Sequence, residues 1–138
     1  MEEINNFQHN CVIIRVRKES IAIRGNLYKA VCRCWAANKK RAEKADFVLA
    51  VVGTIKEKNL VVQAVYKPDR WYYPADVYLC KDKKEECQIL YEVNTDLCNE
   101  YPRIAFEGKE VSKDAYYLHK MLPSKYYPLQ NPVRYTYI

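Results

Sequence analysis

Apolar residues in the first half of the chain occur in short runs that are typical of buried strands. Residues 11–16 (CVIIRV) are β-branched and bounded by polar residues, which predicts a first strand. Two further runs, residues 47–52 (FVLAVV) and 60–66 (LVVQAVY), are separated by a polar stretch of hairpin-loop composition. These two runs are expected to pair as antiparallel strands.

Between the first strand and this hairpin the hydrophobic period changes to that of a helix. The apolar residues recur at i, i+3, i+4, i+7 and i+8, the spacing of one helix face: Leu27, Ala30, Val31, Cys34 and Trp35. Asn26 is placed to cap this helix, and Asn38 is placed to cap a short, very basic turn at residues 39–44. An amphipathic helix reaching Trp35, followed by a basic turn, is therefore predicted.

In the second half of the chain the apolar runs are shorter and are interrupted by prolines and charged residues. Residues 67–76 (KPDRWYYPAD) contain Pro68 and Pro74, which lack a ladder donor, so this segment is predicted to be an aromatic-rich loop. The remaining predicted elements are short strands at 77–80, 87–93 and 103–106, a helical turn at 113–122, and a strand within 133–138. Together these elements predict an α+β fold: a small curved, mostly antiparallel sheet or open β-barrel with one or two packed helices.

Length and charge narrow the class of protein. A chain of 138 residues is the size of one domain, so residues 1–138 are predicted to form a single unit. The formal charge of +6 favours anionic partners, although such an excess is also ordinary solubility chemistry. The 13 tyrosines favour the first interpretation slightly, because aromatic and basic residues together suit base stacking beside phosphate contacts.

Targeting and redox signals are weak. The first ten residues have no signal-peptide pattern, and no apolar stretch approaches the ~20 residues of a membrane span, so a cytoplasmic protein that does not bind membranes is expected. Without a secretion signal the six cysteines are expected to be free thiols. Cys32 and Cys34, two apart on the predicted helix, point to different faces, so no zinc site, and no cofactor, is expected.

Catalytic chemistry finds little support in the sequence. The two histidines, His9 and His119, have no serine, cysteine or acid near them in a recognisable triad or metal motif. The chain is therefore predicted not to be an enzyme.

Aromatic residues are the first candidates for a binding site. Trp71, Tyr72 and Tyr73 are consecutive, so in a loop between two prolines at least one of them is expected to be exposed and able to stack on a base. The alternative is a packed loop lid. Trp35 offers a large rigid π-face, and its helical spacing fits a core residue equally well.

Polar residues complete the candidate site. Lys39, Lys40, Arg41 and Lys44 form the densest basic patch and suit a phosphate backbone, although a solvated helix face is the commoner explanation. The other polar candidates for ligand binding are Arg24, Asn38 and Arg134. Arg24 precedes a glycine and a helix N-terminus, Asn38 offers an amide, and Arg134 alternates with tyrosines in the last strand; caps or an outer strand face also explain them.

The order of elements over residues 11–66 resembles a known family. A strand (CVIIRV), a polar link, a helix ending in CWAAN, a lysine-rich turn and two strands (FVLAVV, LVVQAVY) are similar to YTH domains and their EVE and ASCH relatives, the PUA-like barrels. The resemblance implies that residues 1–138 are one PUA-like domain. It places Trp35 where YTH readers carry one wall of a cage around a methylated adenine, and Trp71 near a second cage tryptophan.

Two functional hypotheses remain open. The first is a reader of nucleic acid that binds a modified or flipped base in an aromatic cage, with basic contacts to the backbone. The second is an anti-defence sponge that sequesters a cyclic dinucleotide or related nucleotide signal. The segments FEG and NPVRY look like those of small bacterial and phage proteins of this architecture. A phage-encoded sponge is expected in the host cytoplasm, with its pocket between subunits of a homo-oligomer.

Overall fold

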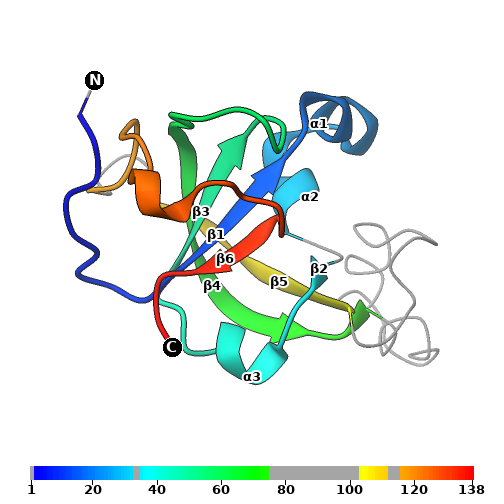
Figure 1. Cartoon of the computed structure of the whole chain (residues 1–138). Coiled ribbons are helices and arrows are strands. Elements are labelled where there is room, and N and C mark those ends of the chain that lie inside the picture. Colours follow the sequence, from blue (N-terminus) through cyan, green and yellow to red (C-terminus); the bar gives the residue numbers. More distant parts are fainter. Residues whose placement is uncertain (1, 33–34, 75–102, 112–115) are drawn as a thin grey trace, which may run out of the picture.

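The computed structural model describes residues 2–32, 35–74, 103–111 and 116–138 (Figure 1). The strands are β1 (Cys11–Val16), β2 (Trp35–Ala36), β3 (Phe47–Val52), β4 (Val62–Tyr72), β5 (Arg103–Glu110) and β6 (Val133–Tyr135). The helices are α1 (Lys18–Arg24), α2 (Leu27–Val31), α3 (Lys39–Ala42) and a 3-10 turn, η3 (Ser124–Tyr126). The strands predicted at 77–80 and 87–93 lie outside the described residues.

The six strands of the described chain form one mixed sheet in the order β2-β5-β4-β3-β1-β6. The neighbours β1 and β3 are parallel, and the other four pairs are antiparallel. The sheet curves into a nearly closed, barrel-like shape with few, short helices (Figure 1). The predicted α+β fold, a small curved and mostly antiparallel sheet with packed helices, is confirmed.

β1 lies near the middle of the sheet and is buried along its whole length, as its apolar run predicts. One of its faces, which we call the inner face, carries Val12, Ile14 and Val16 and packs with buried residues of α2 and α3. The opposite face belongs to a second apolar cluster with the N-terminal segment and residues 117–129. The sheet therefore separates two cores, and the residues of α2 and α3 border the inner one.

Arg15 is the buried polar residue of β1. Its Nε donates to the carbonyl oxygen of Leu129 (3.1 Å) and its Nη1 to that of Gly53 (3.3 Å). Burial, together with the nearby charge of Arg17, lowers the pKa of the Arg15 guanidinium. The side chain thus links β1 to the end of β3 and to the C-terminal segment.

The prediction of an aromatic loop at 67–76 is wrong over most of that segment, because strand β4 continues to Tyr72. Pro68 is accommodated at a bulge: it lies opposite Gly108, and the register with β5 shifts between Pro68 and Arg70. A Cβ on Gly108 would lie 2.3 Å from the carbonyl oxygen of Lys67, so only glycine permits this close approach of the strands. The missing proline donor is thus tolerated where the ladder is already irregular.

The predicted amphipathic helix is also shorter than its period suggested. Asn26 caps α2 as expected, accepting from the Lys29 backbone N–H (2.8 Å), but α2 ends at Val31. Trp35 instead begins β2, paired with Ile104 of β5. The strand pairing replaces the helical turn that the spacing predicts.

The segment between β1 and α2 contains a helix that the hydrophobic pattern does not indicate. No residue of α1 is fully buried, although Ile21 packs against the inner core from one side. The helix ends at Gly25, whose φ of 106° is the left-handed region that favours glycine.

The C-terminal third differs in one respect from its prediction. Of the helical turn expected at 113–122, the described residues 116–119 form a turn, with a φ of 63° at His119, and no helix. The final alternation is confirmed as β6, which pairs antiparallel with β1. Among the described residues no helix is long and apolar enough to cross a membrane.

Candidate functional site

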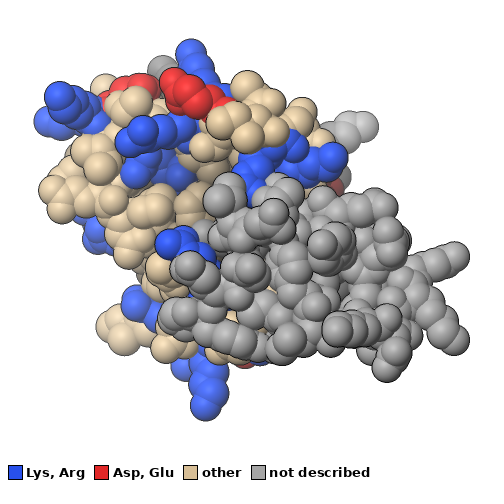
Figure 2. Space-filling model, turned by 90° about the vertical axis from the view of Figure 1, so that its right-hand side faces the viewer, with Lys and Arg blue, Asp and Glu red and all other residues tan. Residues whose placement is uncertain are grey.

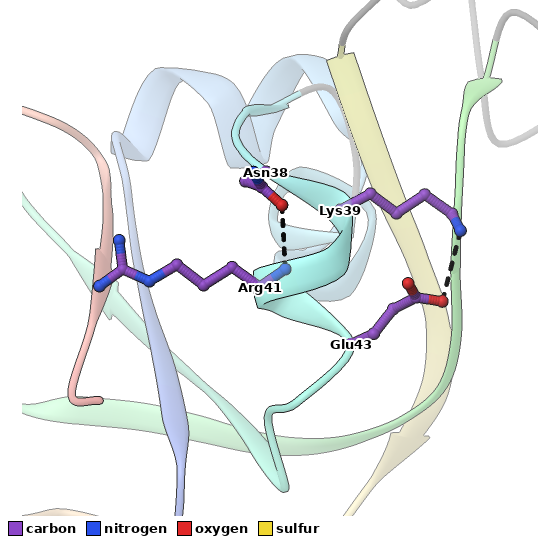
Figure 3. A network of polar contacts seen from close by, with 4 residues as sticks. All are labelled: Asn38, Lys39, Arg41 and Glu43. Carbon is purple, nitrogen blue, oxygen red and sulfur yellow. Dashed lines mark hydrogen bonds and ion pairs between the residues drawn. The ribbon is translucent and has the colours of Figure 1, made fainter. Parts of the chain in front are cut away.

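The basic turn predicted after Asn38 is confirmed as α3. The Asn38 side chain accepts a hydrogen bond from the Arg41 backbone N–H (3.0 Å), which satisfies one of the free donors at the start of the helix (Figure 3). Lys39 and Glu43, one turn apart, form an ion pair at 3.3 Å. Figure 3 shows their side chains on one side of α3, toward β4 and β5, and Arg41 reaching to the opposite side.

Arg41 joins α3 to β6 and the residues that follow it. Its guanidinium lies 4.1 Å from the centre of the Tyr135 ring, and its Nη2 donates to the carbonyl oxygen of Tyr137 (2.8 Å). In return the Tyr137 hydroxyl donates to the carbonyl oxygen of Arg41 (2.6 Å), and the Tyr135 hydroxyl donates to that of Asn38 (3.4 Å). Burial raises the pKa of both tyrosines, so they stay neutral donors.

The two tryptophans lie on the same face of the sheet, on either side of β5. Trp35 of β2 is opposite Ile104, and Trp71 of β4 is opposite Phe106. Ile104 and Phe106 are two residues apart on one strand, and residues in register share a face, so all four side chains belong to the inner face. The sequence-predicted pair Trp35 and Trp71 is thus brought to one surface.

Trp71 is a buried residue of β4 and not the loop residue that the prolines suggested. Its side chain is 6% exposed and its ring centre lies 5.0 Å from that of Phe106. Its indole Nε1 is buried and has no hydrogen-bond partner among the described residues. A buried donor without an acceptor costs about 1–3 kcal/mol, so this N–H is an unusual feature of the inner face.

Trp35 is more accessible. It is half-buried against the inner-face core, and its indole Nε1 donates to the carbonyl oxygen of Val31 (2.7 Å), which fixes the orientation of the ring. The helical spacing therefore predicted the wrong secondary structure for Trp35, which lies in a strand. Its prediction that Trp35 packs against the core is partly correct.

Lys39 connects the basic helix to the aromatic face. Its Nζ lies 5.6 Å from the centre of the Tyr73 ring, and Tyr73 packs against the same core cluster as Trp71. Tyr72 faces the other side of β4, where Arg70 lies 5.7 Å from its ring centre and pairs with Glu107 at 3.1 Å. Of the three predicted aromatics, Trp71 and Tyr73 therefore share the inner face and Tyr72 does not.

The remaining predicted residues are spread over the molecule. Lys40 and Lys44 are exposed on and after α3, and Arg134 is exposed on β6 with its guanidinium 5.3 Å from the Tyr126 ring centre. Arg24 is half-buried at the end of α1, and its Nη1 has no partner among the described residues. In Figure 2, Lys and Arg side chains are dispersed over the described part of the face shown, whereas Asp and Glu gather near its upper edge.

Sequence reasoning missed Phe106 and Tyr135. Phe106 lies beneath Trp71, and Tyr135 holds the Arg41 side chain. The alternation of Ile104 and Phe106 in RIAF was available as a signal for the first, since residues two apart in a strand share a face.

His9 and the described cysteines lie among structural contacts. His9 Nδ1 shares a hydrogen bond with the Tyr117 hydroxyl (2.9 Å). Cys11 and Cys32 are buried thiols that form no disulfide among the described residues, and burial raises the pKa of the Cys11 thiol to about 12. The described residues contain no cluster of His, Cys, Asp and Glu suited to a metal ion. The other cysteines lie outside the described residues.

Comparison of the chain with protein-family models, with curated proteins and with solved structures found no match. The resemblance to PUA-like barrels consequently stays a prediction.

Proposed function

We propose that this protein binds a nucleotide-containing ligand on the inner face beside β2, β5 and β4, holding a base by stacking and doing no chemistry on it. One observation carries the proposal: the two tryptophans of the chain lie on one face on either side of β5, and the Trp71 N–H has no partner among the described residues. The same proposal includes membership of the PUA-like barrels.

Stacking is the contact that the aromatic geometry supports. Neighbouring strands lie about 4.8 Å apart, so Trp35 and Trp71 are separated by β5, whose Ile104 and Phe106 side chains lie between them on the same face. Trp35 is half-buried with its ring orientation fixed by Val31, so little side-chain freedom is lost on binding. A stacked base contributes about 1–3 kcal/mol.

A hydrogen bond from the Trp71 N–H would fix the orientation of a bound base. A carbonyl oxygen or ring nitrogen of a base would satisfy this donor, and a ligand without an acceptor would leave it unpaired. Lys39, beside Tyr73, supplies positive charge for phosphate near the same face, and Lys40 and Lys44 are exposed on and after α3. These features favour a reader of a modified or flipped base.

Tryptophan fluorescence tests the proposal, because the chain has only two tryptophans. The protein is titrated with single-stranded oligonucleotides, modified nucleosides and cyclic dinucleotides, and one class is expected to change the emission. The single-tryptophan variants Trp35→Phe and Trp71→Phe then assign the signal, and the second also removes the unpaired N–H while keeping an aromatic ring.

Matched variants of neighbouring tyrosines locate the site. Tyr73→Ala on the inner face is expected to weaken binding, whereas Tyr72→Ala on the opposite face leaves it unchanged. No emission change with any of the three ligand classes contradicts the proposal.

A second candidate function is sequestration of a small free nucleotide such as a cyclic dinucleotide. The contacts that the basic residues of α3 already make within the protein favour it. Lys39 is paired with Glu43, and Arg41 is bound to Tyr135 and Tyr137. A polymer backbone gains from many free cations, whereas a dinucleotide with two phosphates needs few.

A further inference from the structure

A groove of about 430 Å³ lies where the start of α2 meets the C-terminal half of β5 and the middle of β4. Its lining residues are Asn26, Leu27, Tyr28, Tyr66, Gly108 and Glu110. None of these is a residue of the candidate nucleotide site. The groove is therefore a separate feature of the molecule.

Two tyrosine rings form the aromatic wall of this groove. The ring centres of Tyr28 and Tyr66 lie 5.3 Å apart with a tilt of 55°, and both rings contact Phe106. The Tyr28 hydroxyl accepts a hydrogen bond from the Gly108 backbone N–H (3.2 Å), which holds that ring in place. The wall is consequently a preformed aromatic surface with negative π-faces.

Tyr66 adds an unused polar group. Its side chain is 3% exposed, it lines the groove, and its hydroxyl makes no hydrogen bond to any residue that the structure describes. Burial, together with the charge of Glu110, raises the pKa of this hydroxyl, so it stays neutral and can accept a hydrogen bond. A ligand with an N–H donor satisfies this oxygen.

The charge at the groove is opposite to that of the whole protein. The chain carries a formal +6, yet Glu110 lines the groove and no Lys or Arg is among its lining residues. Burial raises the pKa of Tyr28, and the nearby charges of Glu107 and Asp69 raise it a little further, although Glu107 is paired with Arg70. The local field favours a cation.

We propose that the Tyr28–Tyr66 groove binds the ammonium group of a small free organic amine. The two π-faces attract the positive charge, the Tyr66 hydroxyl accepts one N–H, and the Glu110 carboxylate balances the charge at the rim. Leu27 contacts the alkyl part of such a ligand. Phe106 packs against the aromatic residues of both sites, but the residues that line the groove are not those proposed to contact the nucleotide, so different variants test the two proposals.

Isothermal titration calorimetry tests the groove with putrescine as the probe and butane-1,4-diol as its neutral counterpart of equal length. The diamine is expected to bind and the diol is not. Tyr66→Phe keeps the ring and removes only the hydroxyl, and Glu110→Gln removes only the charge; each is expected to weaken diamine binding about tenfold. Glu3→Gln, at a carboxylate lining a different groove, is the control and binds as the native protein does.

Each outcome of this experiment is decisive. Equal binding of diol and diamine, native affinity in both Tyr66→Phe and Glu110→Gln, or no diamine binding at all overturns the proposal. If N-acetyl-lysine methylamide binds more tightly than free alkylamines, the occupant is a protein side chain and the assignment to a free amine is wrong. Thermal unfolding of each variant establishes that lost binding does not come from lost folding.

Discussion

The guanidinium of Arg41 lies 4.1 Å above the ring of Tyr135, and through it helix α3 is attached to strand β6. The backbone oxygen of Arg41 and that of Tyr137 each accept a hydrogen bond from the other residue's side chain. β2 and β6 are the two edges of the sheet, and α3 follows β2 directly in the chain. This contact therefore ties one edge region to the other and completes the barrel-like shape.

Arg41→Ala is expected to lower the free energy of unfolding by about 1–2 kcal/mol, because it removes a cation–π contact and a charged hydrogen bond. Lys40→Ala is the matched control on the same helix and is expected to change stability by less than about 0.5 kcal/mol. Urea denaturation measures both. Equal effects of the two substitutions would show that α3 does not close the sheet through Arg41.

Trp71→Ala is expected to destabilise the protein by about 3–5 kcal/mol, since it leaves a cavity against Phe106. Trp71→Phe retains most of the ring contact and is expected to cost less than half as much. Denaturant titration followed by far-UV circular dichroism compares the two variants. A Trp71→Ala protein as stable as the native one contradicts the buried position of this residue.

The elements that were predictable from sequence depend on local interactions. β1 and β3 coincide with short runs that are almost entirely apolar, and the Asn26 and Asn38 caps each involve a backbone N–H three residues away. Such contacts are encoded within a few residues. They could be located without knowing the rest of the fold.

The elements that were not predictable depend on distant partners. Trp35 leaves the helical pattern because β2 pairs with β5, whose residues are far away in the chain. Pro68 remains in a strand because Gly108 on β5 lets the two backbones approach. For the same reason the sequence indicated that Trp35 and Trp71 belong together but not that Phe106 lies beneath Trp71 or that Lys39 lies beside Tyr73.

Salt dependence is expected to separate the two functional candidates. Binding to a polymer releases one counterion for about every phosphate contact, so the logarithm of affinity falls steeply with the logarithm of salt concentration. A free dinucleotide contacts the protein through two phosphates and gives a shallow slope. Fluorescence titrations at a series of salt concentrations measure the slope, and a steep slope without binding of free dinucleotides eliminates the sequestration candidate.

Cys11 is expected to make stability depend on pH in the alkaline range. Its pKa is raised from 9.0 to about 12 in the folded protein, so the neutral thiol stabilises the fold fully below about pH 9 and this contribution is lost as the pH rises toward 12. The loss is about 1.4 kcal/mol per pH unit. Urea denaturation at increasing pH is expected to show a steeper decline for the native protein than for Cys11→Ala, in which the buried tyrosines still titrate; parallel declines contradict the assignment.

The bulge beside Pro68 determines which side chains of β4 face the inner surface, because it shifts the alternation of the strand by one residue. Before the bulge the even-numbered Ala64 and Tyr66 contribute to the inner core, and after it the odd-numbered Trp71 and Tyr73 do. Without the one-residue offset, the alternation of the strand would present Arg70 and Tyr72 inward and turn both Trp71 and Tyr73 to the opposite face. The one extra residue at the bulge thus decides which side chains line the inner surface: a regular strand with the same residues would place an arginine and a tyrosine where Trp71 and Tyr73 now lie.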